Sequence, residues 1–473
     1  MTKRALVTGA NGFIGSHLVR HLLSRGYQVS GLVRKTSDIT SLGGLPIRLH
    51  IGDVREPDTL VEPLREADYV FHLAGELMAL RREAFEATNT GGTRNMLEVA
   101  ARVKPASFHR FLYTSSQACA GPGDSTTPMT EASPRNPISW YGTSKRDAED
   151  VVHSFAGRVP ATIVRPASVY GARERDLSQT YGPVYNRLHP ILGILPKYIV
   201  AVYVEDLVRG MADAVESQET IGRTYFLNHP EILSASDVIN SIARGMDKPA
   251  GLPFPVPLVL IQLAAPAAEL IHRFTRGRPK MTRDKAREVS QRFWVASPGA
   301  AERDFGWRAH NNMEEGMRPT TKAWRAAAVE LQTMALEDIR WAKYLIVASI
   351  LGGLTEAVSH LGRFYEFNPG WLVWVVIFGA FGLALGSLAM LLRRASGLLQ
   401  FLAGTVLAGS AEALNVAVLH TWTFAPGWPL GITDGYVRAA VLGPAGGVFV
   451  LIVNAIMRSL YKLRLRMGDS NEP

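Results

Sequence analysis

The chain has 473 residues, more than one hydrophobic core usually spans, so at least two domains are expected. Its formal net charge of +9 suits an anionic cofactor or an anionic membrane surface, and the lack of basic runs interleaved with aromatic residues predicts that no nucleic acid binds. The lone cysteine, Cys119, excludes a disulfide framework within the chain, and no zinc-type spacing predicts a metal site.

Glycines follow the first apolar run at a spacing typical of nucleotide-binding turns. Residues 5–7 are predicted to form a buried strand, and a helical pattern starts near residue 14. Gly9 would form the tight turn, Gly12 would let a pyrophosphate approach the backbone, and Gly15 would let the helix pack close to the strand. The position after the first strand favours a dinucleotide-binding element over an ordinary strand-to-helix turn.

Short apolar runs alternate with helical patterns up to about residue 170. Such alternation is typical of a parallel sheet with helices on both faces. The predicted strands cover residues 5–7, 28–33, 47–51, 69–73, 111–114 and 162–165. We therefore predict an α/β fold, a doubly wound Rossmann-type parallel sheet, over residues 1–171. Because the first strand starts within a few residues of Met1, we expect no signal peptide and a cytoplasmic location for this domain.

The end of the second predicted strand indicates which nicotinamide cofactor is used. An Asp or Glu at this position binds the ribose 2′-hydroxyl of NAD, whereas a nearby Arg accommodates the 2′-phosphate of NADP. Here Val33 is followed by Arg34 and Lys35, and a guanidinium suits bidentate phosphate binding. We therefore favour NADP(H), and NAD(H) is the alternative if both cations are only solvated loop charges.

Two polar stretches carry the predicted chemistry. Tyr141 and Lys145 lie four residues apart near a helix start, which places them on one helical face. A lysine ammonium lowers the pKa of a nearby phenol and makes it a usable acid or base near neutral pH. A serine hydroxyl in the stretch 113–116, at the end of the fifth strand, would hold the substrate oxygen. This spacing also occurs on surface helices, but the glycine turn and the serine-rich strand end favour catalysis.

An ordered set of motifs over residues 1–327 resembles the extended short-chain dehydrogenase/reductases (SDRs). The matching pieces are Thr8-Gly9-x-x-Gly12-x-x-Gly15, Asp53-Val54, His72-Leu73-Ala74-Gly75, Asn89-Thr90-x-Gly92-Thr93, Tyr113-Thr114-Ser115-Ser116, Tyr141-x-x-x-Lys145, Arg165-Pro166-x-x-Val169-Tyr170-Gly171, Tyr203-Val204-Glu205-Asp206-Leu207 and Phe305-Gly306-Trp307. Ser116 with the following Ala120-Gly121-Pro122, and the apolar segment 252–272, make the chain most similar to the 3β-hydroxysteroid dehydrogenase/isomerase group.

The resemblance implies a role for individual residues. Tyr141 would be the general acid/base, Lys145 would hold the nicotinamide ribose and tune Tyr141, and Ser116 would polarise the substrate oxygen. Asn89 would brace the active-site helix. The expected cofactor contacts are Gly9, Asn11, Gly12, Phe13, Ile14, Gly15, Arg34, Lys35, Asp53, Val54, Leu73, Ala74, Gly75, Asn89, Tyr141, Lys145 and Pro166. NAD-using members of the family carry an acidic residue at the end of the second strand, where this sequence has Val33.

Residues 172–327 are less regular and richer in Pro and Arg. In extended SDRs this part forms a smaller substrate domain, with some segments interleaved with the nucleotide-binding domain. An apolar segment covers residues 252–272, too short and too interrupted by proline to predict a transmembrane helix. It would form either a buried helix or an apolar lip that touches the bilayer.

The composition changes abruptly after Glu330. A linker over residues 328–340 leads to a predicted all-α domain at 341–460, in which four apolar segments near 341–361, 371–392, 398–419 and 436–457 are each long enough to cross a bilayer. Arg and Lys lie mostly on one side, which places both termini, the catalytic domain and the basic tail 461–473 in the cytoplasm. Glu356 and Glu412 within the spans indicate a polar pocket or a hydrogen-bond network. We expect a multi-pass protein of a bacterial cytoplasmic membrane.

The sequence thus predicts a membrane-anchored NAD(P)-dependent oxidoreductase that moves hydride between the nicotinamide and a secondary alcohol or ketone. The bilayer favours an apolar substrate, such as a sterol, hopanoid, quinone or polyprenyl-linked compound. A nucleotide-sugar epimerase or dehydratase is the enzymatic alternative. A nucleotide-binding sensor or scaffold at the membrane is the alternative from another class. The direction of the reaction and the formation of a homodimer stay open.

Overall fold

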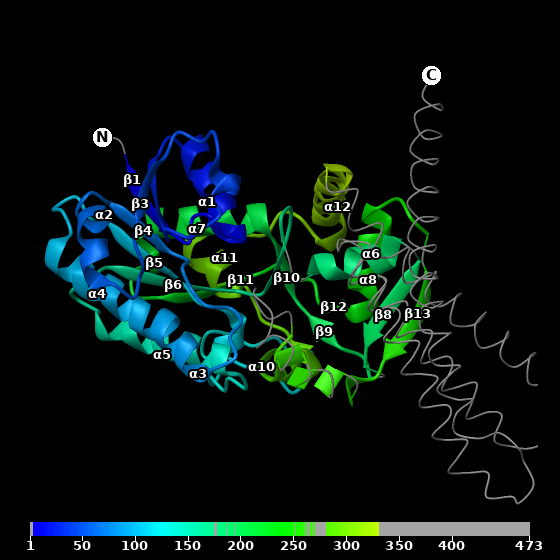
Figure 1. Ribbon diagram of the computed structural model, residues 1–473. Coiled ribbons are helices and arrows are strands. Elements are labelled where there is room, and N and C mark those ends of the chain that lie inside the picture. The colour runs from blue at the N-terminus through cyan, green and yellow to red at the C-terminus, as the bar shows by residue number, and fades with distance from the viewer. Residues whose placement is uncertain are drawn as a thin grey trace, which may run out of the picture. The chain divides into compact units, whose positions relative to one another are not determined.

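The computed structural model describes residues 3–330, apart from 175–176, 186, 194, 250, 260, 263–264, 267 and 270–280, and a parallel seven-stranded sheet organises them (Figure 1). The predicted membrane spans with Glu356 and Glu412, and the tail 461–473, lie outside the described residues. Within the described part, none of the helices combines the length and apolar character needed to cross a bilayer.

The strand order of the large sheet is β11-β6-β5-β4-β1-β2-β3, with all neighbours parallel. The order reverses between β1 and β4, and open α/β sheets bind their ligands at such a switch point, outside the carboxyl ends of the strands. The strands are β1 (Arg4–Thr8), β2 (Gln28–Val33), β3 (Arg48–Ile51), β4 (Tyr69–His72), β5 (Arg110–Thr114), β6 (Ala161–Pro166) and β11 (Thr224–Leu227).

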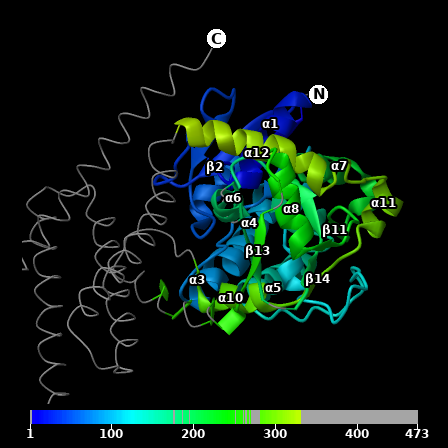
Figure 2. The same cartoon turned by 90° about the vertical axis from the view of Figure 1, so that its right-hand side faces the viewer.

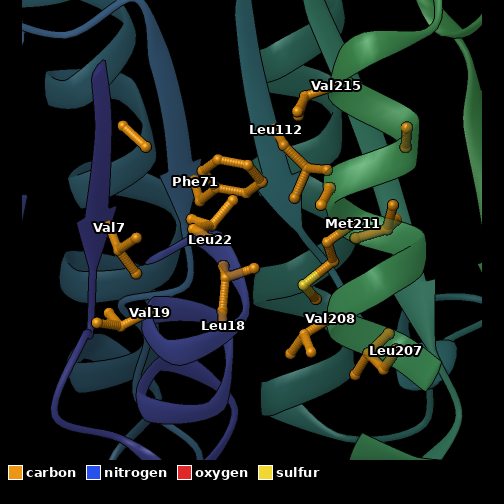
Figure 3. Close-up of a cluster of buried hydrophobic side chains, with 14 of the residues drawn as sticks. Val7, Leu18, Val19, Leu22, Phe71, Leu112, Leu207, Val208, Met211 and Val215 are labelled. Atoms are coloured by element: carbon orange, nitrogen blue, oxygen red, sulfur yellow. The ribbon is translucent and has the colours of Figure 1, made fainter. Parts of the chain in front are cut away.

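Helices cover both faces of this sheet because successive side chains of a strand point to opposite faces. Val7 of β1 belongs to a buried cluster with α1 (Phe13–Ser24) and α7 (Val204–Glu216), in which Leu18 and Met211 lie (Figure 3). The preceding Leu6 belongs to a second cluster on the other face. That cluster is covered by α2 (Val61–Arg65), α4 (Gly92–Val103) and α5 (Trp140–Ser154). The sheet is therefore buried on both sides, as its apolar runs predict.

A smaller part lies beyond the carboxyl ends of the strands. It contains the pairs β7 (Ser168–Tyr170) with β10 (Ala201–Tyr203) and β8 (Leu188–Leu192) with β13 (Leu252–Val256), and a three-stranded sheet of β9 (Tyr198–Ile199), β12 (Leu233–Ser234) and β14 (Phe293–Trp294). Its helices are α6 (Tyr181–Tyr185), α8 (Ala235–Gly245), α10 (Arg283–Ser290) and α12 (Met313–Glu330). Figure 2 shows α12 crossing α8, with which it shares a third buried cluster.

Short helices complete the fold. They are α3 (Arg82–Phe85), the π-helical turn Glu86–Gly91 that continues it into α4, the 3₁₀ turn Gln117–Cys119 after β5, and α11 (Gly299–Phe305). Four further 3₁₀ turns cover Thr40–Leu42, Pro57–Leu60, Leu177–Thr180 and Gln218–Thr220. The turns at 86–91 and 117–119 both pack against α5, so they position the active-site helix.

The six predicted strands are confirmed, each to within one residue at either end. The seventh strand, β11, was not predicted, and it joins the sheet from the part expected to bind substrate. The segment 252–272 begins with β13 rather than with a helix, so a buried helix is wrong for residues 252–256. Pro253 and Pro255 lack the N–H that an α-helix needs, whereas an edge strand tolerates them.

Candidate active site

Backbone contacts that only glycine permits shape the turn between β1 and α1. Gly9 has a positive φ of +67°, and the Gly12 N–H donates to the Gly9 carbonyl oxygen over 2.9 Å. A Cβ on Gly15 would overlap that same oxygen. Gly12 is the N-cap of α1 and has no side chain to accept a hydrogen bond, and the first turn of α1 contains no acidic residue. The N–H groups of this turn therefore fit a pyrophosphate.

The end of β4 connects this turn to the active-site helix. A Cβ on Gly9 would lie 3.0 Å from the backbone nitrogen of Ala74, so the two chain segments are in contact. A Cβ on Gly75 would lie 3.5 Å from Nζ of Lys145. The glycine turn, the predicted cofactor residues Leu73 to Gly75 and the amine of Lys145 are thus adjacent, at the switch point between β1 and β4.

Helix α5 carries Tyr141 in its first turn and Lys145 one turn later. Tyr141 is half-buried, and its ring lies 6.3 Å from that of Phe85. Lys145 is only 4% exposed, and its Nζ donates to the Thr114 carbonyl oxygen at the end of β5 over 2.8 Å. Burial lowers the pKa of Lys145 from 10.5 to about 8. The amine is thus fixed between the end of β5 and the segment that follows β4.

Of the two adjacent serines after β5, only the second faces outward. Ser115 is buried, whereas Ser116 is half-buried and caps the following 3₁₀ turn by accepting the Ala118 N–H over 3.2 Å. A Cβ on Gly142 would overlap the Ala118 carbonyl oxygen, so the first turn of α5 packs directly on this turn. The structure therefore brings the segments of Ser116, Tyr141 and Lys145 together, and their chemical roles stay predictions.

The loops after β2 and β3 would hold the adenosine half of a dinucleotide. Arg34 and Lys35 are exposed there, next to the glycine turn, since Asn11 Nδ2 donates to a backbone oxygen of the same loop over 3.0 Å. Asp53 binds Arg55 through contacts of 2.6 and 3.0 Å. These hydrogen bonds hold the pKa of Asp53 below its usual value. The Asp53 carboxylate is therefore charged and already bound to Arg55. The sequence pattern did not indicate this ion pair.

The other predicted cofactor residues are more buried. Phe13 and Ile14 are partly buried, whereas the side chains of Val54, Pro166 and Asn89 are buried. A cofactor would therefore meet little of the side chains of Val54 and Pro166. The Asn89 amide spans the gap between two elements, because its Nδ2 donates to Ser144 Oγ of α5 over 2.8 Å and its Oδ1 accepts the Glu76 N–H over 2.7 Å.

Two acidic residues of α10 hold the start of the active-site helix. The carboxylate of Asp284 accepts the backbone N–H groups of Trp140 (2.7 Å) and Tyr141 (3.3 Å). Glu288 accepts from the hydroxyl of Ser139, the N-cap of α5, over 2.6 Å. Sequence reasoning missed this contact, since Asp284 lies 144 residues from Trp140 and no local motif marks it.

A buried ion pair lies under α5. Glu149 binds Arg165 of β6 over 2.7 Å, and both side chains are almost fully buried. Burial alone would raise the pKa of Glu149, but the hydrogen bond from Arg165 keeps it below its usual value. Glu149 follows Lys145 by four residues on α5, and Arg165 belongs to a motif quoted above, but no spacing along the chain indicates that the two residues pair.

Comparison with known proteins agrees with this geometry. The model of the NAD dependent epimerase/dehydratase family matches residues 5–227. The chain is 32% identical over 270 residues to the putative dihydroflavonol 4-reductase of Synechocystis, covering 54% of this chain and 75% of that protein. It is 33% identical over 172 residues to sterol demethylase protein B of Methylococcus capsulatus, covering 35% of this chain and 51% of that protein.

A third relative is the 3 beta-hydroxysteroid dehydrogenase/Delta 5-->4-isomerase of Mycobacterium tuberculosis, 30% identical over 252 residues, with 48% of this chain and 65% of that protein covered. The crystal structure of UDP-glucuronic acid 4-epimerase from Bacillus cereus in complex with NAD has the same fold, with a TM-score of 0.54 and 21% identity over 68% of this chain and 99% of that one. The chain therefore belongs to the NAD dependent epimerase/dehydratase family, the extended SDRs, and is an NAD(P)-dependent enzyme.

Proposed function

We propose that this protein is a membrane-anchored oxidoreductase that interconverts a secondary alcohol and a ketone on an apolar, sterol-like substrate. The observation that carries the proposal is the buried amine of Lys145, held by the Thr114 carbonyl oxygen beside Gly75 and one helical turn from Tyr141. This arrangement supports a tyrosine that works as an acid or base at the edge of a nicotinamide site.

Each residue has a distinct task in this proposal. The phenol of Tyr141 gives its proton to the carbonyl oxygen in the reductive direction and takes it back in the oxidative direction. The ammonium of Lys145 stabilises the phenolate that is left. The Ser116 hydroxyl donates to the same substrate oxygen and holds it in place. The bound nicotinamide supplies or accepts the hydride at the substrate carbon.

We further propose NADP(H) as the preferred cofactor. Arg34 and Lys35 are exposed in the loop after β2, and Val33 is buried where an acid would hold the 2′-hydroxyl of NAD. The carboxylate of Asp53 accepts its hydrogen bonds from Arg55, and the loop cations Arg34 and Lys35 would receive the phosphate. NAD(H) stays the alternative, because the name of the matching family and the epimerase structure both refer to NAD.

The proposed substrate class has two supports. Relatives of this chain are named for a sterol demethylase protein and for a 3 beta-hydroxysteroid dehydrogenase, and sterols are apolar secondary alcohols. The apolar segments after Glu330 are long enough to anchor the enzyme in a bilayer, from which such a substrate would come. The basic residues that flank these segments favour a catalytic domain on the cytoplasmic side.

The test uses the full-length protein in detergent micelles with NADP⁺ or NAD⁺. Cholesterol and a hydroxylated hopanoid are the probes, with UDP-glucose as the polar comparator, and the formation of free reduced cofactor is measured. We expect the apolar alcohols to reduce the cofactor. The rate of this reduction should fall at least about 100-fold in Tyr141→Phe. The Tyr198→Phe variant is the control, since its ring packs on Phe293 in another sheet. Turnover of UDP-glucose with retained cofactor would instead favour the epimerase.

A further inference from the structure

Both ring nitrogens of a buried histidine contact hydroxyl groups. His72, the last residue of β4, is fully buried. Its Nδ1 lies 2.8 Å from Thr8 Oγ1, at the end of β1 beside the glycine turn. Its Nε2 lies 3.1 Å from Thr93 Oγ1 in α4. Whether each nitrogen donates or accepts depends on the tautomer, and the neighbouring atoms decide it.

The Thr93 side determines where the ring proton lies. Thr93 Oγ1 is 2.6 Å from the backbone carbonyl oxygen of Asn89. A carbonyl oxygen only accepts, so the one hydroxyl hydrogen of Thr93 must point to Asn89. The Thr93 oxygen can then only accept from His72. Nε2 of His72 therefore carries the hydrogen.

The Thr8 side leads independently to the same tautomer. Thr8 Oγ1 accepts the backbone N–H groups of Leu73 over 3.1 Å and of Ala74 over 3.0 Å, which fills its two lone pairs. Its own hydrogen is left to donate to Nδ1 of His72. Burial and the nearby Lys145 lower the pKa of His72 to about 3, so the ring stays neutral at physiological pH.

The resulting chain of hydrogen bonds joins two parts of the site. At one end, Thr8 fixes the backbone of Leu73 and Ala74, which contacts the glycine turn. At the other end, Thr93 orients the carbonyl of Asn89, whose amide donates to Ser144, and Ser144 Oγ donates to the carbonyl oxygen of Tyr141 over 2.7 Å. The imidazole is thus one link between the nucleotide turn and the active-site helix, beside the direct contact of Asn89 with the Glu76 backbone.

We propose that His72 is a positioning residue that works through one fixed tautomer. Its Nδ1 holds the nucleotide-binding backbone through Thr8, and its Nε2–H holds the active-site helix through Thr93. The proposal rests on the proposed function only in taking that backbone as the cofactor site. It goes beyond that function by assigning the two ring nitrogens to two separable tasks.

Two substitutions separate the tasks, because each keeps one polar atom of the ring. His72→Asn places an acceptor oxygen where Nδ1 stood, and His72→Gln places a donor nitrogen where Nε2 stood. His72→Phe removes both, and His153→Asn, near the far end of α5, is the remote control. The full-length protein is titrated with NADPH by its nicotinamide fluorescence, and hydrogen exchange is followed at the amides of residues 141–145.

The two variants should differ in opposite ways. In His72→Asn the dissociation constant for NADPH stays within about two-fold of the native value, while exchange at 141–145 becomes roughly ten-fold faster. In His72→Gln the exchange stays native-like, while NADPH binds roughly ten-fold more weakly. His72→Phe shows both changes. A merely structural role would instead lower the melting temperature of both variants and give no such split.

The proposal is overturned if the Asn and Gln variants change NADPH binding and exchange alike, or if neither changes. A measurement on the native protein covers the case in which variants fail to fold. Nitrogen NMR of histidine-labelled protein, with the His72 signals told apart from those of the other histidines by sequential assignment, should show a neutral His72 imidazole with a bare Nδ1 and a protonated Nε2, and the opposite tautomer at His72 would overturn the proposal. Failure of sterol oxidation, with NADPH still bound, would reject the proposed function and leave these results intact.

Discussion

The amine of Lys145 donates to the carbonyl oxygen of Thr114 over 2.8 Å, in a position that is almost completely closed to solvent. Helix α5 and strand β5 are therefore joined by a buried ammonium. Its partner in this hydrogen bond is a neutral carbonyl oxygen and not a carboxylate. A buried ammonium without a direct anion is costly to charge, which is why its pKa falls to about 8. The same property makes the amine a sensitive part of the site.

The stability of the cofactor-free protein should rise from pH 8 to pH 10.5 because of Lys145. Burial lowers the pKa of Lys145 from 10.5 to about 8, so the unfolded chain binds more protons than the folded one between these values. The free energy of unfolding therefore increases with pH in this window, by on the order of 3 kcal/mol. Lys145→Met should remove most of the rise in melting temperature, leaving the smaller part that comes from the lowered pKa of Lys197, whereas Lys322→Met, on an exposed position, should keep it. A rise of undiminished size in Lys145→Met contradicts the prediction.

Reversing one charge after β2 should change the cofactor preference. The Arg34 side chain is exposed, and its backbone N–H donates to Ser37 Oγ over 3.2 Å, so Arg34→Asp leaves the loop intact. Loss of a charged hydrogen bond should weaken NADPH binding about ten- to a hundred-fold and leave NADH binding nearly unchanged. Fluorescence titration with both cofactors measures this. Arg48→Ala, an exposed change on neighbouring β3, is the control, and equal weakening of both cofactors would reject the assignment.

An added methyl group in the first turn of α1 should disturb both the fold and cofactor binding. A Cβ on Gly15 would overlap the Gly9 carbonyl oxygen, and backbone cannot move aside as a side chain can. We expect Gly15→Ala to destabilise the protein by roughly 1–3 kcal/mol and to weaken NADPH binding. Gly43→Ala is the matched control, since its Cβ would meet its nearest atom at an ordinary 3.4 Å. Native-like melting and binding in Gly15→Ala would show that the turn adapts.

Removing the carboxylate that holds the start of α5 should slow turnover more than cofactor binding. Asp284 accepts the N–H groups of Trp140 and Tyr141, so Asp284→Ala frees the turn that carries the phenol. We expect a loss of about 1 kcal/mol in stability, a lower kcat for cholesterol oxidation and an unchanged dissociation constant for NADPH. Asp284→Asn should recover part of the kcat, because the amide oxygen can still accept an N–H group. Asp237→Ala removes a similar cap from α8 and should destabilise the protein without lowering kcat.

The sequence by itself determined the elements that depend on neighbours along the chain. Apolar runs bounded by turn residues located six strands of the sheet, because a strand buried on both faces needs an uninterrupted run of apolar side chains. The spacing of Gly9, Gly12 and Gly15 located the nucleotide turn, and the spacing of Tyr141 and Lys145 placed both on one face of one helix. These patterns are local, so they are visible before the chain folds.

Tertiary structure decided what depends on residues far apart in the chain. Strand β11 joins the sheet beside β6, Asp284 reaches α5 from 144 residues away, and the tautomer of His72 follows from Thr8 and Thr93 on separate elements. No sequence pattern marks such contacts, because they exist only when folding brings the partners together and excludes water. Burial lowers the pKa of Lys145, and the neighbouring donors and acceptors set the direction of the His72 hydrogen bonds. No spacing along the chain contains either property.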